Sequence, residues 1–371
     1  MRIALIGLRG IPEVQGGIER HCQELCPRIS NLVGAITLIA RSGYVPTENY
    51  NYCNVRIKPL WAPKKKGFEA FFHTFLGLIW LIKNRKDFDI IHIHGIGPSL
   101  FAPLARLAGF KIVVTNHGPD YDRKKWGKFA QFILRTGESI GSKYAHKLIA
   151  VSKTIRENLD KNYSTDCCYI PNGVKINCDE LPGKTLSNFN LSPKRYVLAV
   201  GRLVPEKGFH DLMDAFEEIE TDWKLVIVGD ADHENDYSRY IKNKARLSGK
   251  IMMIGYQNGD TLKELYSNAG LFVLPSYHEG LPIVALEAMS FELPMFVSDI
   301  PANKEIALPD ETFPVGDINA LAKKMSDFFS KPTYYFRPEN FDIKKQRLMK
   351  EYNWDHIAEE TIKVYRQIFP A

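Results

Sequence analysis

The sequence lacks the features that mark several large classes of protein. None of its apolar runs approaches the roughly 20 residues that a membrane-spanning helix requires. The six cysteines form no C-x2-C pair, so neither a zinc site nor a disulfide framework is indicated. The N-terminal stretch MRIALIGLRG lacks the apolar region and small-residue cleavage site of a signal peptide. These absences favour a cytoplasmic protein.

Two common ligand motifs are also missing. The stretch GLRGIPEVQGG does not have the spacing G-x-G-x-x-G, and no clear acidic residue follows about 20 positions later, so NAD binding is not indicated. His92 and His94 would place both rings on one face of a strand, but no third metal ligand is evident. Repeats of the solenoid type are absent as well.

What is present is an ordinary globular composition with an uneven distribution of charge. The chain has 371 residues, of which 45% are hydrophobic and 25% charged, and this length suggests two domains. The net charge is +6, yet residues 1–185 carry 27 Lys and Arg against 15 Asp and Glu, whereas the remainder is acidic. The basic clusters at 64–66, 83–86 and 123–128 suit nucleic acid, a phosphorylated substrate or an acidic membrane, unless they are only solvated surface charge.

Strand and helix signals alternate in both halves of the chain. Short, non-alternating apolar runs separated by helical stretches predict parallel strands that are buried on both faces. The runs are RIALIG, GAITLIA, DIIHIH, KIVVTNH and KLIAVS in the first half, then RYVLAVG, WKLVIVGD, KIMMIGY, LFVLPS and PMFVSD. The fold class is therefore α/β, with two Rossmann-like, doubly wound domains. Ligands of such sheets bind beyond the carboxyl ends of the strands, so we expect the two edges to face an interdomain cleft.

The stretch HEGLPIVALE predicts an anion site between two carboxylates. Pro282 suits the first position of a helix, where its missing N–H costs nothing. The N–H groups of residues 283–285 would then be free at the positive end of the helix dipole. Glu279 lies before the helix and Glu287 lies inside it. A nucleotide sugar would fit, with its sugar at one carboxylate and its ribose at the other.

A second stretch, GRLVPEKG, supplies cations for the same ligand. Arg202 follows a predicted strand, and Lys207 comes five positions later, before a predicted helix. An arginine neutralises phosphate through forked hydrogen bonds, and a lysine does so as a point charge. The pair predicts a diphosphate site.

Together with IPNGV at 170–174, these stretches closely resemble the retaining glycosyltransferases of family 4, which have the two-domain B-type fold. The resemblance covers essentially the whole chain. It implies that Glu279 contacts donor-sugar hydroxyls, that Glu287 holds the ribose, and that Arg202 and Lys207 bind the diphosphate. It also implies an active-site role for His117. The remaining implied donor contacts are Gly16, Gly17, Gly280, Leu281, Pro282, Ile283 and Val284.

The resemblance also implies that no metal and no cofactor takes part. Asp230-Ala231-Asp232 looks like the D-x-D motif of metal-dependent transferases, but the family carries a similar turn there without a metal. One departure concerns residues 301–305, PANKE, where the family often has a Gly-Gly pair shortly before a glutamate. That departure leaves the sugar and phosphate contacts of this loop open.

The first domain is expected to bind the acceptor. The segment HGPDYDRKKWGKF at 117–129 resembles a subgroup that assembles surface polysaccharides, including rhamnosyl- and glucosyltransferases. Its cations suit a polyprenyl-diphosphate-linked glycan or an anionic membrane, whereas nucleic acid is not an expected partner. The candidate acceptor contacts are Arg9, Asp120, Arg123 and Lys125. We expect the domain to span 1–178 and to be completed by a helix at 354–371, with a linker at 179–194 and a nucleotide-sugar domain at 195–353.

The predicted activity is transfer of a hexosyl group from a nucleotide diphosphate sugar to a glycan, with retention of configuration. Three alternatives stay open. The two carboxylates could serve a hydrolase, the same fold could serve a nucleotide-sugar epimerase, or the chain could be a non-catalytic sugar-nucleotide-binding protein. The expected location is the cytoplasm, with peripheral binding at the inner face of the cell membrane.

Overall fold

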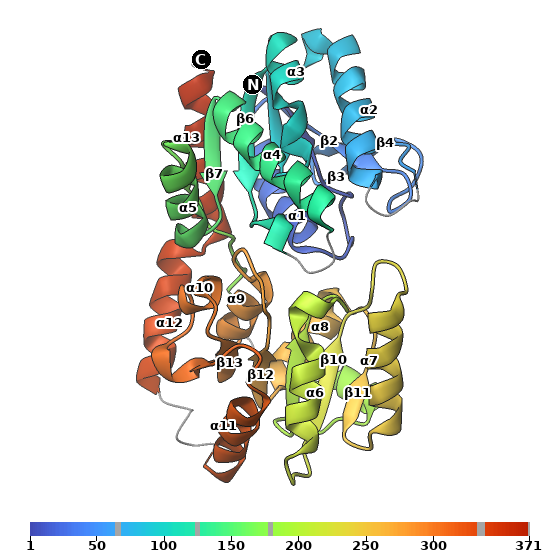
Figure 1. The fold of residues 1–371 in the computed structure, drawn as a ribbon, viewed down its shortest axis with the longest axis vertical. Coiled ribbons are helices and arrows are strands. Elements are labelled where there is room, and N and C mark those ends of the chain that lie inside the picture. The colour runs from blue at the N-terminus through green and yellow to red at the C-terminus, as the bar shows by residue number, and fades with distance from the viewer. Residues whose placement is uncertain (64–67, 123–126, 177–180, 332–337, 370–371) are drawn as a thin grey trace. The chain divides into compact units, whose positions relative to one another are not determined.

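The computed structural model describes residues 1–63, 68–122, 127–176, 181–331 and 338–369. The chain forms two compact units (Figure 1). Unit 1 comprises Met1–Asn172 and Trp354–Ala371, and unit 2 comprises Gly173–Asn353. No described helix is both long and apolar enough to cross a membrane.

Unit 1 is built around an eight-stranded sheet in the order β3-β4-β2-β1-β5-β6-β7-β8. All neighbouring strands are parallel except β3 and β4. Its strands are β1 (Arg2–Ile6), β2 (Ala35–Arg41), β3 (Tyr50–Tyr52), β4 (Val55–Leu60), β5 (Ile90–His94), β6 (Lys111–Asn116), β7 (Lys147–Ala150) and β8 (Cys168–Tyr169). Its helices are α1 (Gly17–Ser30), α2 (Glu69–Lys83), α3 (Ala102–Leu107), α4 (Lys128–Tyr144), α5 (Lys153–Tyr163) and α13 (Trp354–Ile368), with short 3-10 turns η1 (Arg85–Asp87), η2 (Pro98–Phe101) and η3 (Asp120–Asp122).

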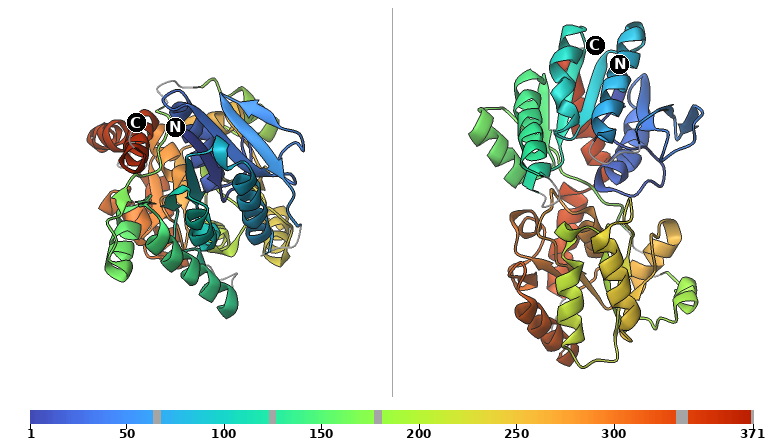
Figure 2. Two further views of the ribbon diagram at one scale, coloured as in Figure 1. Left: turned by 90° about the horizontal axis from the view of Figure 1, so that it is seen from above. Right: turned by 45° about the vertical axis from the view of Figure 1, so that its right-hand side comes forward.

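Helices cover both faces of this sheet. Ile3 and Leu5 of β1 join a core cluster that also contains residues of α1 and α13, among them Trp354. The other face is closed by α2, where Gly77 lets the helix approach Ile6. The two chain ends lie near each other on this unit in every view (Figures 1 and 2). Burial of both faces explains why the strands read as continuous apolar runs.

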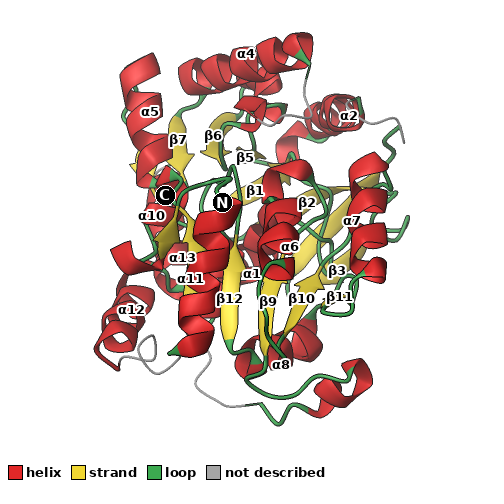
Figure 3. Cartoon of the chain, turned by 60° about the horizontal axis from the view of Figure 1, so that its bottom comes forward, coloured by secondary structure: helices red, strands yellow, loops and turns green. Residues whose placement is uncertain are grey.

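Unit 2 has a six-stranded parallel sheet in the order β11-β10-β9-β12-β13-β14, and Figure 3 shows β12, β9, β10 and β11 side by side. Its strands are β9 (Tyr196–Val200), β10 (Lys224–Val228), β11 (Ile251–Met253), β12 (Leu271–Leu274), β13 (Met295–Ser298) and β14 (Thr312–Phe313). Its helices are α6 (Phe209–Glu217), α7 (Asp236–Leu247), α8 (Gly259–Asn268), α9 (Ile283–Ser290), α10 (Pro301–Lys304), α11 (Ile318–Ser330) and α12 (Pro338–Glu351), with 3-10 turns η4 (Lys184–Phe189), η5 (Pro205–Lys207) and η6 (Pro309–Glu311). The expected doubly wound α/β class is confirmed.

Each sheet reverses its strand order at one point. In unit 1 the reversal falls between β1 and β5, and in unit 2 between β9 and β12. The connections that leave such a pair of strands diverge to opposite sides, which opens a crevice at their carboxyl ends. The glycine-rich segment follows β1 and His94 ends β5, whereas Arg202 and Ser276 follow β9 and β12.

The observed division of the chain differs from the expected boundaries. Most of the expected linker packs on unit 2, because the N–H of Leu181 donates to Oγ of Ser267 at 3.1 Å and the N–H of Thr185 donates to Glu264 at 2.7 Å. Helix α13 belongs to unit 1, so the chain passes between the units at 172–173 and again at 353–354.

Candidate active site

In unit 2 the loops that follow β9 and β12 meet through a buried ion pair. Nζ of Lys207 lies 2.6 Å from Oε1 of Glu279, and the Ser276 hydroxyl donates to the same oxygen at 2.7 Å. The two charged side chains are only 16% and 11% exposed. The switch point of the sheet therefore carries a cation and an anion held in a fixed arrangement.

Gly208 permits the close approach of these two loops. Its φ is +66°, and a Cβ there would lie 2.2 Å from the carbonyl oxygen of Pro275. A side chain at this position would force the loops apart. The N–H of Tyr277 also donates to the carbonyl of Glu206 at 2.9 Å, which fastens the loops to each other.

The Glu279 carboxyl is held in its ionised form. Burial by itself raises its pKa, but the charge of Lys207 and the hydrogen bonds from Lys207 and Ser276 outweigh this effect and leave the pKa below its usual value. An ionised carboxylate accepts hydrogen bonds from hydroxyl groups and has no proton to give. Glu279 is thus suited to hold sugar hydroxyls and unsuited to act as a general acid.

The helix after Glu279 begins one residue later than expected. Pro282 is the N-cap in an extended conformation, and α9 starts at Ile283. The N–H of Ala285 donates to the carbonyl of Pro282 at 3.1 Å, so the expectation of three free amides was wrong for this one. Within the described residues no backbone acceptor is recorded for the N–H groups of Ile283 and Val284. Two amides at the positive end of the helix therefore remain for an anion.

Glu287 lies one turn into α9. It comes four residues after Ile283, about 6 Å along the axis at ~1.5 Å per residue. The hydroxyl of Tyr266 lies 3.2 Å from its Oε2, and the Tyr266 ring is buried and stacks on Phe291. This packing fixes the position of the hydroxyl that orients Glu287.

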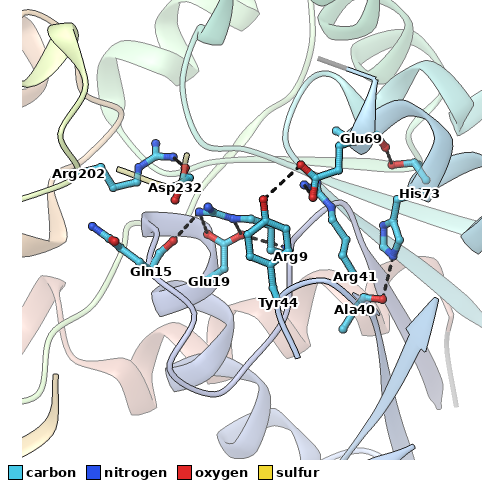
Figure 4. A network of polar contacts seen from close by, with 12 residues as sticks. Arg9, Gln15, Glu19, Ala40, Arg41, Tyr44, Glu69, His73, Arg202 and Asp232 are labelled. Atoms are coloured by element: carbon cyan, nitrogen blue, oxygen red, sulfur yellow. Dashed lines mark hydrogen bonds and ion pairs between the residues drawn. The ribbon is translucent and has the colours of Figure 1, made fainter. Parts of the chain in front are cut away.

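Arg202 is held by an acidic residue that follows β10. Its Nη1 lies 2.8 Å from Oδ2 of Asp232, as Figure 4 shows. The neighbouring Asp230 pairs with Lys242 at 2.7 Å. The two carboxylates of the D-x-D-like stretch therefore face different cations, and Asp232 positions a cation expected to bind phosphate.

The segment 301–305 supports the loop of Glu279 through hydrogen bonds to Ser298 at the end of β13. Nδ2 of Asn303, a fully buried residue, donates to the carbonyl of Ser298 at 2.9 Å. The Ser298 hydroxyl in turn donates to the carbonyl of Ser276. The sequence that replaces the family's glycine pair thus connects the ends of β13 and β12.

In unit 1 a second buried ion pair orders the glycine-rich segment. Nε of Arg9 lies 3.1 Å from Oε1 of Glu19, and Arg9 Nη2 donates to the carbonyl of Gln15 (Figure 4). The Arg9 side chain also lies over the ring of Tyr44. Because the guanidinium is buried and bound to its own loop, the geometry favours a supporting role for Arg9 over direct contact with an acceptor.

Figure 4 also shows a companion network beside this pair. The hydroxyl of Tyr44 donates to Glu69 at 3.3 Å, and Glu69 pairs with Arg41 at 3.4 Å. His73 approaches the carbonyl of Ala40 at 3.0 Å. Tyr44 thus links α2 to the loop that Arg9 holds.

Four histidines gather at the carboxyl edge of β5 and β6. Nδ1 of His94 lies 3.0 Å from Nε2 of His117, and the ring of His21 stands edge-on to His117 with 5.0 Å between centroids. His92 lies behind them and contacts the hydroxyls of Tyr365 and Thr115, each at 2.7 Å. His117, the expected active-site residue, is therefore part of a buried imidazole cluster.

Burial keeps these rings neutral. It lowers the pKa of His21 to about 4 and that of His92 to about 3, and the pKa values of His94 and His117 fall well below 6.5. Nδ1 of His21 lies 2.9 Å from Oδ1 of Asn172, so Nδ1 carries the proton and Nε2 keeps its lone pair.

The sequence profiles of two glycosyltransferase families match nearly all of this architecture. The profile described as Glycosyltransferase Family 4 matches residues 15–177, and the profile described as Glycosyl transferases group 1 matches residues 186–353. The chain belongs to glycosyltransferase family 4.

Two relatives are similar in sequence to this glycosyltransferase over most of its length. An uncharacterised glycosyltransferase of Methanocaldococcus jannaschii is 28% identical and covers 99% of this chain and 98% of its own. The UDP-Gal:alpha-D-GlcNAc-diphosphoundecaprenol alpha-1,3-galactosyltransferase of Escherichia coli is 28% identical over 81% of this chain and 76% of its own.

Solved structures support the B-type glycosyltransferase fold. Sucrose-phosphate synthase of Thermosynechococcus elongatus superposes with a TM-score of 0.84 at 21% identity, over 99% of each chain. The Anabaena protein HepE in complex with UDP-glucose gives a TM-score of 0.80 at 15% identity, over 99% of this chain and 100% of that one. The fold expected from the sequence is confirmed.

The structure gathers the expected donor residues of unit 2 along one edge of its sheet. Gly280 and Leu281 lie between Glu279 and the start of α9, and Leu281 is buried. Among the acceptor candidates, Asp120 lies in η3, whereas Arg123 and Lys125 lie outside the described residues.

Several supporting residues had not been identified from the sequence. Ser298 ends β13 and Ser276 follows β12, whereas Asn303 lies in α10, and the sequence assigned a partner to none of the three. His21 was missed because it lies in an ordinary amphipathic helix. Its partners come from β5 and from the loop after β6, so only the tertiary fold brings the histidines together.

The two adjacent glycines should respond differently to replacement by alanine. At Gly16, with φ +152°, a Cβ would lie 2.0 Å from Oε2 of Glu19 and 2.4 Å from Nη2 of Arg9. Gly16→Ala should therefore lower the free energy of unfolding by about 1–3 kcal/mol. A Cβ at Gly17 meets nothing within 4 Å, so Gly17→Ala at the helix start should stabilise by about 0.5–1 kcal/mol. Urea denaturation measures both, and equal effects would contradict the geometry.

Acid should destabilise the folded chain through its buried histidines. An unfolded histidine binds a proton near pH 6.5, whereas folded His92 stays neutral down to about pH 3, so the free energy of unfolding falls as the pH drops below 6.5. Each such histidine contributes a slope of about 1.4 kcal/mol per pH unit. His92→Gln should flatten the pH dependence between pH 6 and 5 by up to this amount in urea denaturation. His356→Gln, at an exposed position of α13, is the matched control. Equal slopes for the two variants would show that His92 is not held neutral.

Proposed function

We propose that the protein transfers a hexosyl group from a nucleotide diphosphate sugar to a lipid-linked glycan, with retention of configuration. The observation that carries the proposal is the Lys207–Glu279 pair, which lies at the switch point of unit 2 beside the start of α9. Lys207, Arg202 and the two helix amides supply positive charge for a diphosphate leaving group. Glu279 and Glu287 supply acceptors for hydroxyl groups on either side of it.

Leaving-group departure proceeds, in this proposal, by electrostatic stabilisation without a metal or cofactor. The cations are already oriented by carboxylates, so little reorganisation is needed when charge develops on the phosphate oxygens. In this proposal Gly16, Gly17 and His117 of unit 1 contribute to donor binding, as the resemblance to the family implies.

The ionised state of Glu279 argues against its acting as the general acid of a glycoside hydrolase. A glycoside hydrolase needs one carboxylic acid with a raised pKa to protonate the leaving group. The pKa of Glu279 is shifted in the opposite direction by Lys207 and Ser276. An epimerase or a binding protein could use the same site, so the acceptor dependence of turnover decides between them.

The activity is tested with UDP-, GDP-, ADP- and dTDP-sugars, with and without a polyprenyl-diphosphate-linked acceptor. We expect nucleotide diphosphate release only with acceptor, and NMR of the product should show the donor's anomeric configuration. Release without acceptor would indicate hydrolysis. Epimerised donor, or tight binding without turnover, would each refute the transferase.

Two variants dissect the donor site. Lys207→Ala removes the cation and should lower kcat by roughly 100-fold or more, because one leaving-group contact of this type is worth about 3 kcal/mol. Glu287→Ala should mainly raise the donor KM. Tyr266→Phe keeps the packing and removes only the hydroxyl that contacts Glu287, so its smaller KM effect is the matched control. If Glu287→Ala abolishes kcat at unchanged KM, the proposed ribose contact is wrong.

We further propose that unit 1 binds the anionic surface of the membrane that holds the lipid-linked acceptor. The buried side of α2 carries Thr74 and Leu78, whereas Phe71, Phe72 and Phe75 are exposed. On α4, Phe129 and Phe132 are 77% and 66% exposed. Both helices pack against η2, and Phe71 and Phe75 contact Phe101 of this turn, in the basic half of the chain. Exposed aromatic rings beside basic residues suit an anionic lipid interface.

Sedimentation with vesicles tests this surface. The protein should bind phosphatidylglycerol vesicles and release them at high salt, because the attraction is partly electrostatic. The double variant Phe129→Ser/Phe132→Ser should weaken binding at least several-fold. Leu247→Ser changes an equally exposed apolar residue of unit 2 and should have no effect. Equal loss in both variants, or no binding at all, would contradict the proposal.

A further inference from the structure

Three histidines of unit 1 come close enough to share one ligand. His21 comes from α1, His94 from the end of β5 and His117 from the segment after β6. Each offers one ring nitrogen, and these nitrogens lie within 4.8 Å of one another. His21 and His94 are buried, whereas His117 is partly exposed to solvent.

The polar neighbours of His21 prepare it to bind a cation. Its Nδ1–H donates to Oδ1 of Asn172 at 2.9 Å, which directs the lone pair of Nε2 away from Asn172. A hydrogen bond of this kind, to the nitrogen that does not bind the metal, is the usual second partner of a metal-binding histidine.

The distances lie close to those of a three-histidine metal site. Zinc binds imidazole nitrogens at ~2.0–2.1 Å in a tetrahedron, so its ligand nitrogens stand about 3.3 Å apart. The nitrogens of His94 and His117 are already 3.0 Å apart. All the nitrogens lie within 4.8 Å of one another, so metal binding requires a closure of up to about 1.5 Å, which is on the scale of a change in side-chain torsion.

We propose that His21, His94 and His117 bind a divalent transition-metal ion such as Zn²⁺, with the fourth coordination position open toward solvent. Binding needs no net release of protons, because the proton shared by His94 and His117 moves to the other nitrogen of its ring. Three neutral imidazoles and one open position form a donor set that suits zinc, cobalt and nickel better than magnesium or calcium.

The metal would bind the imidazole of His117, the residue to which the proposed function gives a role at the donor sugar. If His117 acts in transfer, then bound metal withdraws its nitrogen from the reaction, and Zn²⁺ inhibits the enzyme until a chelator removes it. This consequence rests on the proposed function, whereas metal binding itself does not. On the proposed function the bound metal is inhibitory, because it takes a nitrogen that transfer would also use.

Cobalt provides a readout that is independent of activity. Metal-free full-length protein is titrated with Co²⁺, and we expect the visible absorption of tetrahedral cobalt to saturate at one ion per chain. Asn172→Ala should weaken binding about 10–100-fold, because it removes the hydrogen bond that orients His21. His117→Gln changes a partly exposed ring, so it should fold and lose the tetrahedral spectrum.

His92→Gln is the matched control, because both nitrogens of His92 already contact hydroxyl groups. It should keep the spectrum, and circular dichroism checks the fold of every variant. Absence of a tetrahedral spectrum at stoichiometric Co²⁺, or an unchanged spectrum in His117→Gln, would overturn the proposal. Zinc binding without inhibition would leave the metal site intact and refute the role given to His117 in transfer.

Discussion

The ion pair between Lys207 and Glu279 is the constraint on which the donor site depends. It joins the loops after β9 and β12, which diverge from the switch point of the sheet and would otherwise separate. A buried pair of this kind is costly to form, and it persists only when its remaining hydrogen-bonding capacity is used. Ser276 uses part of that capacity, and the positive φ of Gly208 gives the loops room to meet.

The first unit repeats this arrangement with different residues. Arg9 follows β1 as Lys207 follows β9, and Glu19 anchors it as Glu279 anchors Lys207. In both units the pair holds a loop that leads into the first helix of a doubly wound sheet. The two pairs differ in the surroundings of their carboxylates. The carboxylate of unit 2 stands beside an open helix start, whereas Glu19 lies within α1 and serves its own loop.

Much of this architecture could be predicted from the sequence, because strands buried on both faces read as apolar runs. The short strands β3, β8 and β14 lack such runs, and β4 alternates and contains Pro59, so all four escaped prediction. Motif spacing located Arg202, Lys207, Glu279 and Glu287, but their partners depend on how distant strand ends meet. Asp232, Ser276 and Tyr266 are such partners, and motif spacing did not identify them. The start of α9 was placed one residue early because Pro282 suits both N1 and the extended N-cap conformation.

The two units also differ in the charge of the side chains at their sheet edges. Unit 2 presents charged groups that are fixed in pairs, which suits the binding of a charged diphosphate whose charge grows as the bond breaks. The histidine edge of unit 1 is neutral, because burial makes protonation of any one ring costly and a charge on one would oppose a charge on the next. Neutral imidazoles accept hydrogen bonds and bind metals, which imidazolium ions cannot do. On the proposed function, the burial that suits His117 to accept a hydrogen bond from a substrate also suits its cluster to bind the proposed metal ion, so transfer and metal binding would compete for one nitrogen.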